Sequence, residues 1–582
     1  MILQALVKHY EDLLEKGEIP RPGWGTVRVS YALNLDREGN IVDLIPQKVS
    51  KVKGKKTVYE ARNIIVPQPA KRSVDITPNF LCDNSTYVLG VDEKGKPDRT
   101  EKCFNAFCDL HRRLLGNVSS ESAKAVLLFL QNWEPGKALE YDCIAEAWKD
   151  LMAGANILFY YEGEPVTNDE TVKRCWQQYY DTAGAEENGI CMITGKRTQI
   201  AVLHPVIKGV YGAQAMGTSL VSFNAPAFCS YGKEQGENAS VGEYAAAAYG
   251  AALNSLLMDR GHVKWIGDTT IVCWAEGGEE VYQDVGIAAM FGVQDEGRIT
   301  DEDLSAILSA ALAGKPVELE HVKLDLDRHF YILGVAPNAA RLSVRFFWQD
   351  SFGNMLKNIG RHYDRLEMVK PAYEKEDRLS YWRLLQETVN QNARDKVPSP
   401  QMAADVMKAV LTGGKYPASL LNGVMLRIRA EHKVSWGRAS IIKAFFIKNS
   451  NSQCPKEVLQ MALNEESTNQ YYNLGRLFAV LEHVQQEANP GINATIKDRY
   501  FNSAASAPAN TFPLLINLAQ KHLRKCKEEG IRISFQKQIQ GITEKLGEEY
   551  PARMTLPQQG SFHLGYYHQT QKRYEKKEDK EV

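Results

Sequence analysis

Residues 191–257, CMITGKRTQIAVLHPVIKGVYGAQAMGTSLVSFNAPAFCSYGKEQGENASVGEYAAAAYGAALNSLL, combine two loops with a helix. The stretch begins as a glycine-punctuated loop, passes through an apolar run at 220–223, and enters a second loop at 224–242. An alanine-rich helix is predicted at 243–257. Glycines allow positive φ angles and close backbone approach, and amide side chains both donate and accept hydrogen bonds. The pattern predicts a reaching loop attached to a rigid helix, and an ordinary long surface loop is the alternative.

The composition is that of an ordinary globular protein with more than one domain. The chain has 582 residues, of which 44% are hydrophobic and 24% charged. No apolar run approaches the ~18 residues of a membrane span, and the N-terminus resembles an amphipathic helix rather than a signal peptide. The ten cysteines form no CxxC pair. We therefore expect a reduced, cytoplasmic protein that has no disulfide framework and no contact with a membrane.

Charge is nearly balanced overall but uneven along the chain. The formal net charge of −1 argues against a generally basic protein that binds nucleic acid by itself. Residues 48–72 nevertheless hold eight basic residues against one acid, Glu60. Such a local excess can follow a phosphate backbone, and a solvated hairpin tip is the alternative. The basic residues are Lys48, Lys51, Lys53, Lys55, Lys56, Arg62, Lys71 and Arg72.

The hydrophobic patterns predict an α+β protein. Strict alternation at 26–35 and a return strand at 41–45 indicate a hairpin. The order strand, helix, strand, strand, helix across 263–367 suggests a ferredoxin-like or RNA-recognition-like piece. In such a piece the aromatic run at 346–348 would stack bases, although core packing is the simpler interpretation.

Strand signals nearly vanish from about residue 370 onward. Helical patterns take their place, among them 376–394, 455–464 and 468–488. We predict a mixed domain at 1–369 and an all-α helical bundle at 370–582. Polar segments at 395–401 and 449–455 are candidate seams within the bundle.

Residues suited to catalysis form no recognisable motif. The sequence has no phosphate-binding loop, zinc-protease motif, nucleophile elbow or dinucleotide fingerprint. Cys103, Cys108 and His111 come nearest to a metal cluster, but they do not share one tight helix face, so buried thiols are expected. Asp268 could act as an acid, but it has no sequence-local partner. We therefore expect neither a cofactor, nor a metal, nor enzymatic activity.

Four segments carry a resemblance to a known family: CMITGKRTQIAVLHPVIKGV, GAQAMGTSLVSFNAPAFCSYGKEQ, IGDTTIVCWA and GVAPNAARLSVRFFW. They resemble the large subunit of the type I-C CRISPR surveillance complex, Cascade. The resemblance runs essentially end to end, from PGWGTVRVSYAL near the start to GRLFAVLE near the C-terminus.

The resemblance implies a non-catalytic, RNA-guided DNA-binding subunit. It would sit at the 5′-handle end of the CRISPR RNA, beside the backbone and handle-binding subunits. It would read a protospacer-adjacent motif in target double-stranded DNA and promote R-loop formation. It would then recruit the helicase-nuclease that degrades the target.

Residue chemistry within the family-like loop suggests where DNA would be contacted. Guide pairing reads the target, so the protein needs to read only a few base pairs and the backbone. Short amides and close backbone approach suit the degenerate minor groove. The candidates for motif contact are Asn224, Gln235 and Asn238, and Gly232 and Gly236 would let the backbone approach the DNA. Gln235 could also act as a wedge that starts to unstack the bases. Asn79 and Asn84 are second-rank candidates. The candidates for phosphate contact are Lys51, Lys53, Lys55, Lys56 and Lys233.

In the family that the chain resembles, the helical bundle is similar to the small subunit, which can be made from an internal start. Met461 follows the polar seam at 449–455 and is the natural candidate, so a second product of 461–582 is predicted. It would line a DNA strand with Arg524, Lys525 and Lys527. The alternative is that Met461 is an ordinary helix residue.

A second class of function is a stand-alone metal-dependent nuclease or other hydrolase that uses Asp268 and scattered histidines. Metal-dependent cleavage of naked DNA would favour the nuclease. Dependence on guide RNA and partner subunits would favour the surveillance-complex subunit.

Overall fold

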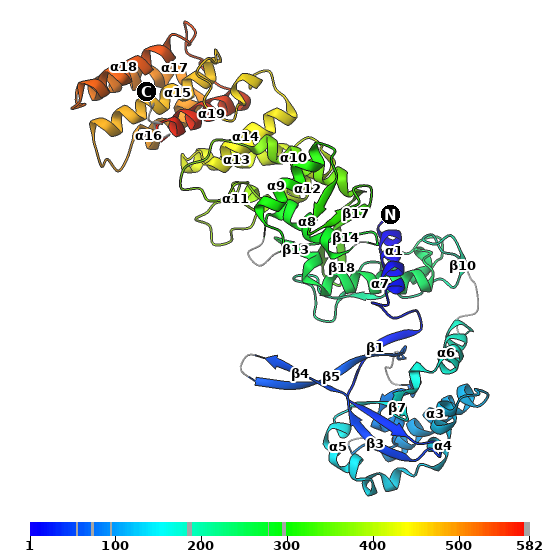
Figure 1. Ribbon diagram of the computed structural model, residues 1–582. Coiled ribbons are helices and arrows are strands. Elements are labelled where there is room, and N and C mark those ends of the chain that lie inside the picture. Colours follow the sequence, from blue (N-terminus) through cyan, green and yellow to red (C-terminus); the bar gives the residue numbers. More distant parts are fainter. Residues whose placement is uncertain are drawn as a thin grey trace. The chain divides into compact units, whose positions relative to one another are not determined.

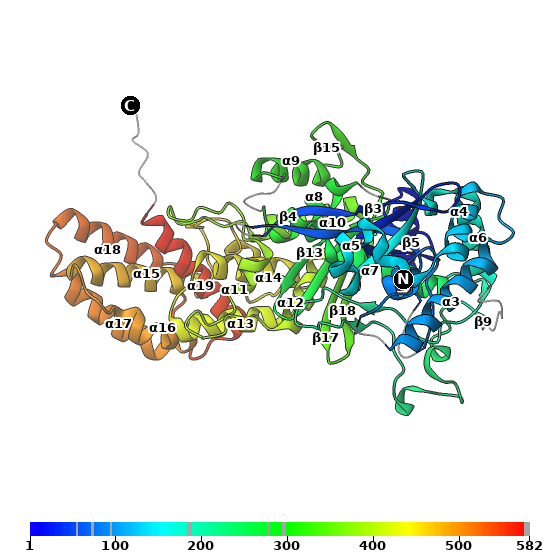
Figure 2. The same ribbon diagram turned by 90° about the horizontal axis from the view of Figure 1, so that it is seen from below.

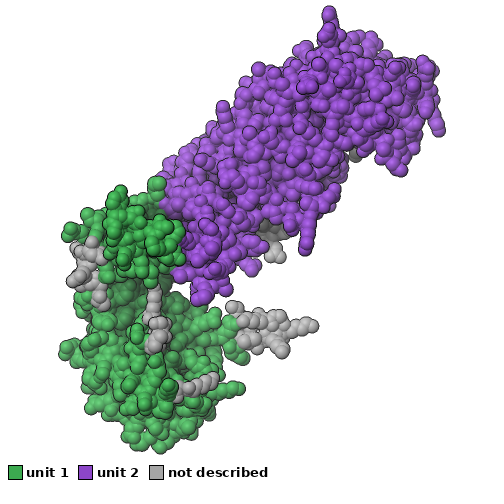
Figure 3. Space-filling view, turned by 180° about the vertical axis from the view of Figure 1, so that it is seen from behind, with its two compact units in different colours: residues 1, 3–205, 221–252 green, residues 2, 206–220, 253–582 purple. Residues whose placement is uncertain are grey.

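The computed structural model describes residues 1–53, 56–70, 75–93, 96–182, 189–277, 279–293 and 298–574, and of 51–53 and 56–58 it describes the backbone alone. Contacts divide the chain into two compact units (Figure 3). Unit 1 comprises residues 1, 3–205 and 221–252, and unit 2 comprises residues 2, 206–220 and 253–582. Strands and helices mix in the N-terminal half, and helices alone follow the last described strand, so the α+β class is confirmed (Figure 1).

A sheet in the order β3-β2-β7-β6 forms the centre of unit 1, with the short β8 beside β7. The predicted hairpin is present as β2 (Tyr31–Leu35) and β3 (Ile41–Pro46), with register Leu33↔Leu44. Leu33, Phe107, Phe129 and Phe159 belong to one buried cluster that joins this sheet to the neighbouring helices. The other strands are β6 (Cys82–Asn84), β7 (Asn156–Tyr161) and β8 (Glu164–Pro165), and the helices are α2 (Ser85–Val88), α3 (Pro97–Leu115), α4 (Glu121–Asn132), α5 (Asp142–Met152) and α6 (Glu170–Thr182).

A second, three-stranded sheet in unit 1 has the order β1-β5-β4. Its central strand β5 (Lys56–Pro67) pairs through 62–67 with β1 (Trp24–Val29) and through 56–61 with β4 (Lys48–Lys53). One face of this sheet is packed, because Val29 and Val66 lie buried with Cys82 and Leu158. In Figure 1, β4 and β5 extend as an arm from the rest of unit 1.

Unit 2 is built on a six-stranded sheet in the order β11-β12-β18-β17-β14-β13. The predicted elements, strand, helix, strand, strand, helix, are all present, but a further helix at 280–291 and a further hairpin at 317–324 lie among them. However, β14 pairs directly with β17, without the intervening strand of a split βαβ unit. The strands are β11 (Val206–Ile207), β12 (Thr218–Ser219), β13 (Val263–Ile266), β14 (Thr269–Ala275), β17 (His329–Asn338) and β18 (Arg341–Ser351), with the separate hairpin β15 (Val317–Leu319) and β16 (Val322–Leu324).

The aromatic run at 346–348 is divided between the two faces of this sheet. Trp348 lies in the hydrophobic core, and Phe346 packs against that core under Gly334. Phe347 points to the opposite face, where its ring stacks on Tyr331 at 6.4 Å. Core packing is therefore the correct interpretation for Phe346 and Trp348.

Helices complete unit 2, and α15 to α19 gather at one of its ends (Figure 2). The hydrophobic core runs without a break from Ile266 to Tyr567, so the boundary predicted at 369 falls inside this core and remains a prediction. The helices are α8 (Glu280–Phe291), α9 (Asp301–Leu312), α10 (Phe352–Leu366), α11 (Tyr381–Gln386), α12 (Pro400–Thr412), α13 (Ala418–Glu431), α14 (Trp436–Asn449), α15 (Gln470–Ala488), α16 (Ile496–Ser506), α17 (Pro508–Leu523), α18 (Glu529–Thr543) and α19 (Leu556–Lys572).

Helices α15 and α19 cross at a pair of glycines. A Cβ on Gly475 would lie 1.9 Å from the carbonyl oxygen of Phe562, and one on Gly565 would lie 2.0 Å from that of Tyr472. Each glycine therefore allows the backbone of the other helix to approach. Every residue of α15 from Tyr472 to Val484 is buried, which makes this helix the centre of the bundle.

Two predicted helices are wrong in extent. The pattern at 376–394 gives only the short helix α11. The polar stretch after α11 forms turns instead of helix, and in one of them the N–H of Ala393 donates a hydrogen bond to the carbonyl of Asn390. The pattern at 455–464 gives one 3-10 turn, Lys456–Val458. Beyond this turn the backbone bonds to other segments, since the Met461 carbonyl accepts a hydrogen bond from the N–H of Val369.

Candidate nucleic-acid interface

The loop at 224–242 is held by the side chain of Asn238. Its amide Nδ2 donates to the carbonyls of Lys233 and Gln235, at 3.2 and 3.0 Å. Its Oδ1 accepts from the N–H of Ser230 at 3.0 Å. All three bonds lie within the loop, so Asn238 acts as an internal brace that fixes the turn at 230–238.

The backbone of this loop is strained where the brace holds it. Tyr231, Gln235 and Ser240 have φ angles of 57°, 41° and 47°, in the left-handed region that costs non-glycine residues about 1–3 kcal/mol each. Gly236 donates to the Val202 carbonyl at 3.0 Å, and a Cβ there would lie 1.8 Å from the carbonyl of Ala201. The close approach at Gly236 is thus to the protein's own backbone. Gly232 has φ +69° and open space around it.

The loop presents Gln235 and Lys233 to solvent, together with Tyr231, which was not among the residues predicted from the sequence. Tyr231 is fully exposed at the tip. Asn224 is exposed at the start of the loop. The Tyr231–Gly232 dipeptide signals a turn, but it does not by itself predict that the ring is exposed. Neighbouring exposed apolar side chains are Met192, Val202, Leu203 and Phe228.

The role of Asn238 can be separated from that of Gln235 by hydrogen exchange. Asn238→Ala removes the acceptor for the Ser230 N–H, and the loop is expected to lose about 1–2 kcal/mol of local stability. Amide exchange across 229–239 should therefore accelerate roughly tenfold. Gln235→Ala, in the same loop, should leave exchange unchanged because its side chain is exposed. Unaltered exchange in Asn238→Ala would contradict the brace.

The second-rank candidates are in unit 1: Asn79 lies in the loop before β6, and Asn84 is the last residue of that strand. Asn79 Oδ1 accepts from the N–H of Ala70 at 2.9 Å, which ties two loop segments together. Asn84 ends β6, and its Oδ1 is buried with no hydrogen-bond partner in the described part of the chain. Neither amide is presented as a free surface group in the way that Gln235 is.

The basic segment forms the arm of β4 and β5. Lys51, Lys53 and Lys56 lie on its strands, where only their backbone is described, and Lys55 lies outside the described residues. Lys48, at the base of the arm, forms an ion pair with Asp150 and donates to the Tyr31 hydroxyl at 3.1 Å. The Asp150 carboxylate raises the pKa of Lys48, so this lysine is committed to the fold.

The predicted residues of the C-terminal part are brought together on one short segment. Arg524, Lys525 and Lys527 are all exposed between α17 and α18. Cys526 among them is buried and anchors the segment. Met461 is half exposed and lies in a bend between the turn at Lys456–Val458 and α15, so it is not a helix residue.

The residues considered for chemistry are engaged in structural contacts. Asp268, in the turn between β13 and β14, pairs with Arg345 Nη2 on β18 at 2.8 Å. His111 Nε2 accepts from the N–H of Leu81, and its Nδ1 lies 2.7 Å from the Phe107 carbonyl. Cys103 and Cys108 are buried, as expected, and burial raises the pKa of Cys108 to about 11. Among the described residues, no group of three acidic, cysteine or histidine side chains could hold a metal.

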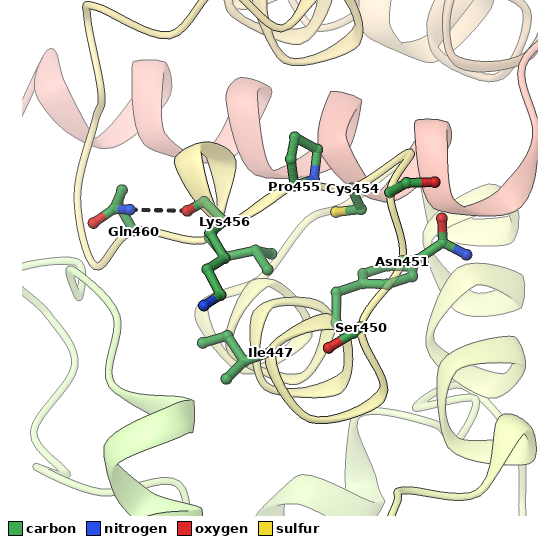
Figure 4. A pocket seen from close by; sticks show the side chains of 10 residues that line it. Ile447, Ser450, Asn451, Cys454, Pro455, Lys456 and Gln460 are labelled. Carbon is green, nitrogen blue, oxygen red and sulfur yellow. Dashed lines mark hydrogen bonds between the residues drawn. The ribbon is translucent and has the colours of Figure 1, made fainter.

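A pocket of about 520 Å³ lies where α14 ends, lined in part by Ile447, Ser450, Asn451 and Lys456 (Figure 4). Cys454 also lines it, and burial raises the pKa of this thiol to about 12, so it is no nucleophile at neutral pH. The lining residues include one cation and no acid or histidine. The pocket therefore offers neither a carboxylate nor an imidazole for proton transfer.

Comparison with known proteins identifies the class. Residues 6–574 match the family model described as CRISPR-associated protein (Cas_Csd1). The chain is thus a CRISPR-associated protein. It belongs to the Cas_Csd1 family. No curated protein matches it. In the part of the chain that the structure describes, no helix has the length and apolar character needed to cross a bilayer.

Proposed function

We propose that the chain is the non-catalytic large subunit of a type I-C CRISPR RNA-guided surveillance complex. The observation that carries the proposal is membership of the Cas_Csd1 family over nearly the whole chain. In this role the protein binds target double-stranded DNA together with CRISPR RNA, the backbone and handle-binding subunits and the small subunit. It reads the flanking motif, promotes R-loop formation and recruits the helicase-nuclease, in the cytoplasm.

The geometry of the loop at 224–242 supports a motif-reading role. A braced backbone presents Gln235, Lys233 and Tyr231 without the entropy cost of ordering a flexible loop on binding. Gln235 can accept and donate at a base edge, and Lys233 can neutralise a phosphate. Asn238 contributes by holding the others in place. The nuclease alternative gains no comparable support, since its proposed acid, Asp268, is paired with Arg345.

The proposal is tested by gel-shift titration of the guide-loaded complex on matched duplex, with and without a T-rich flanking motif. Loss of one base contact costs about 1–3 kcal/mol, so Gln235→Ala is expected to reduce the affinity advantage of the motif roughly tenfold. Binding to the duplex without the motif should change little.

Gln178→Ala, an exposed glutamine on α6, is the matched control and should behave like wild type. If Gln235→Ala and Asn238→Ala both keep the motif advantage, the loop is scaffold and the reader lies elsewhere. If the complex has no guide-dependent DNA binding, or the chain alone cleaves DNA with a metal, the proposed function is wrong.

The small-subunit product is a further expected result of this proposal. Translation from Met461 would yield α15 to α19 without α14, on which α19 packs through Gly560 and Phe446. The product would expose that face of α19 and would therefore be recovered bound to the complex rather than free. Intact-mass analysis of the complex expressed from the native gene should reveal residues 461–582. Met461→Leu should remove this species and leave the full chain, and its absence from the wild-type sample would contradict the prediction.

A further inference from the structure

The sheet β1-β5-β4 has one face that nothing in the described structure covers. Directly opposite residues of an antiparallel pair point to the same side. The pairs Thr26↔Ile65 and Arg28↔Asn63 therefore share a face, which continues along β5 to Tyr59. We call these five residues the open face; all are exposed. The opposite side carries Val27, Val29, Ile64 and Val66, which pack inward.

The open face has the charge of a nucleic-acid surface. Its five side chains include one cation, one amide, two hydroxyls and no acid. The three strands together hold six basic residues against Glu60 alone, and with Lys48 neutralised by Asp150 a net charge of +4 remains in a chain whose net charge is −1. A local excess of this size attracts a phosphate backbone, whereas a protein partner would need a matching acidic surface.

The centre of the open face has the chemistry of duplex recognition. Arg28 and Asn63 are direct cross-strand neighbours, and their side chains have no partner among the described residues. Arginine and asparagine are the side chains that bind base edges with two hydrogen bonds, and arginine also binds phosphate. The strand ladder sets the two Cα positions opposite each other, so that both side chains leave the same face of the sheet.

The shape of the sheet favours double-helical over single-stranded nucleic acid. Because β5 pairs first with β4 and then with β1, a two-stranded ribbon continues directly from the open face (Figure 1). A two-stranded ribbon fits the major groove of B-form DNA. Single strands are held by successive stacked aromatic side chains, and the open face offers only Tyr59, which is 69% exposed.

We infer that the open face is a contact surface for double-helical DNA, with Arg28 and Asn63 at its centre. The inference takes its DNA partner from the proposed function. It assigns a second contact surface, separate in sequence from the loop at 224–242.

The test measures the affinity of guide-loaded complex for matched duplex DNA with Arg28→Ala, Asn63→Ala and the double variant. Both residues are exposed, so the variants should fold and assemble, which circular dichroism and complex purification check. The double variant is expected to bind at least tenfold more weakly. Arg28→Lys should recover part of the loss if the contact is to phosphate, and little of it if the contact is bidentate to a base. Arg37→Ala, a charge-matched change in the β2–β3 turn, should stay within twofold of wild type.

The outcomes separate this inference from the proposed function. Loss of DNA affinity in the double variant supports the open face, whether or not the flanking motif gives an advantage. A wild-type complex that gains no affinity from the flanking motif would count against motif reading and would leave the open face untouched. Wild-type affinity in the double variant overturns the open face and leaves the proposed function standing. Failure of the double variant to assemble into the complex would mark a protein-binding surface and overturn the inference. Absence of duplex binding by the wild-type complex would overturn both.

Discussion

Gly475→Ala is expected to destabilise unit 2 by at least ~3 kcal/mol, at the upper end of the range for overpacked cores. The new Cβ would lie 1.9 Å from the Phe562 carbonyl oxygen, and a backbone atom in the middle of a helix cannot move aside alone. Helices α15 and α19 must separate, which loosens the packing of Phe478 against Phe562 and Tyr566. Urea unfolding monitored by circular dichroism measures the loss.

The matched control is Gly541→Ala in α18. Nothing lies within 4 Å of a Cβ at that position, so the change should stabilise the helix by about 0.5–1 kcal/mol through backbone entropy. A second check is the double variant Gly475→Ala with Gly565→Ala. Because one separation of the helices relieves both clashes, it should cost clearly less than the sum of the single changes. Equal stability of Gly475→Ala and wild type would contradict the close crossing.

Acidification below neutral pH is expected to destabilise unit 2 strongly. Burial lowers the pKa of His362, His483, His563 and His568 to about 3 each. In the unfolded chain these histidines titrate near pH 6.5, so below that pH the unfolded state binds more protons than the folded state. The stability contributed by the neutral rings is complete above pH 6.5 and is lost as the pH falls from 6.5 toward 3. Each histidine then lowers the free energy of unfolding by about 1.4 kcal/mol for every pH unit below 6.5. The four together lower it by roughly 5–6 kcal/mol per pH unit, which is comparable to the whole stability of a typical domain.

The contribution of one ring can be isolated at His563 on α19. Its ring stacks on Phe501 at 5.5 Å, and neither nitrogen has a hydrogen-bond partner in the described part of the chain. His563→Leu should reduce the pH dependence of the unfolding free energy between pH 6 and 4.5 by about 1.4 kcal/mol per pH unit. His563→Gln keeps a buried polar group that cannot be protonated there, so it should flatten the pH dependence equally while being less stable than His563→Leu. An unchanged slope in both variants would show that His563 is not buried neutral.

The two kinds of contact proposed for DNA differ in how they could be found. Charge in the arm is visible in the sequence as a cluster of lysines within nine residues of Lys48. The pairing of Arg28 with Asn63 is invisible there, because the two residues are far apart in the chain and the register of β5 decides which side chains share a face. The same applies to Asn238, whose amide looks like a candidate reader until its three bonds within the loop are known.

The sequence by itself determined the α+β class, the hairpin β2–β3, most helices of the bundle, the absence of a recognisable catalytic motif and the resemblance to a CRISPR-associated family. These features depend on local periodicity, capping and motifs, which neighbouring residues specify. Only the tertiary structure decided the helix crossing at Gly475 and Gly565, the brace at Asn238, the backbone contact at Gly236 and the open face of β1 and β5. Each of these depends on packing between segments distant in sequence, where steric fit and hydrogen-bond satisfaction outweigh local preference.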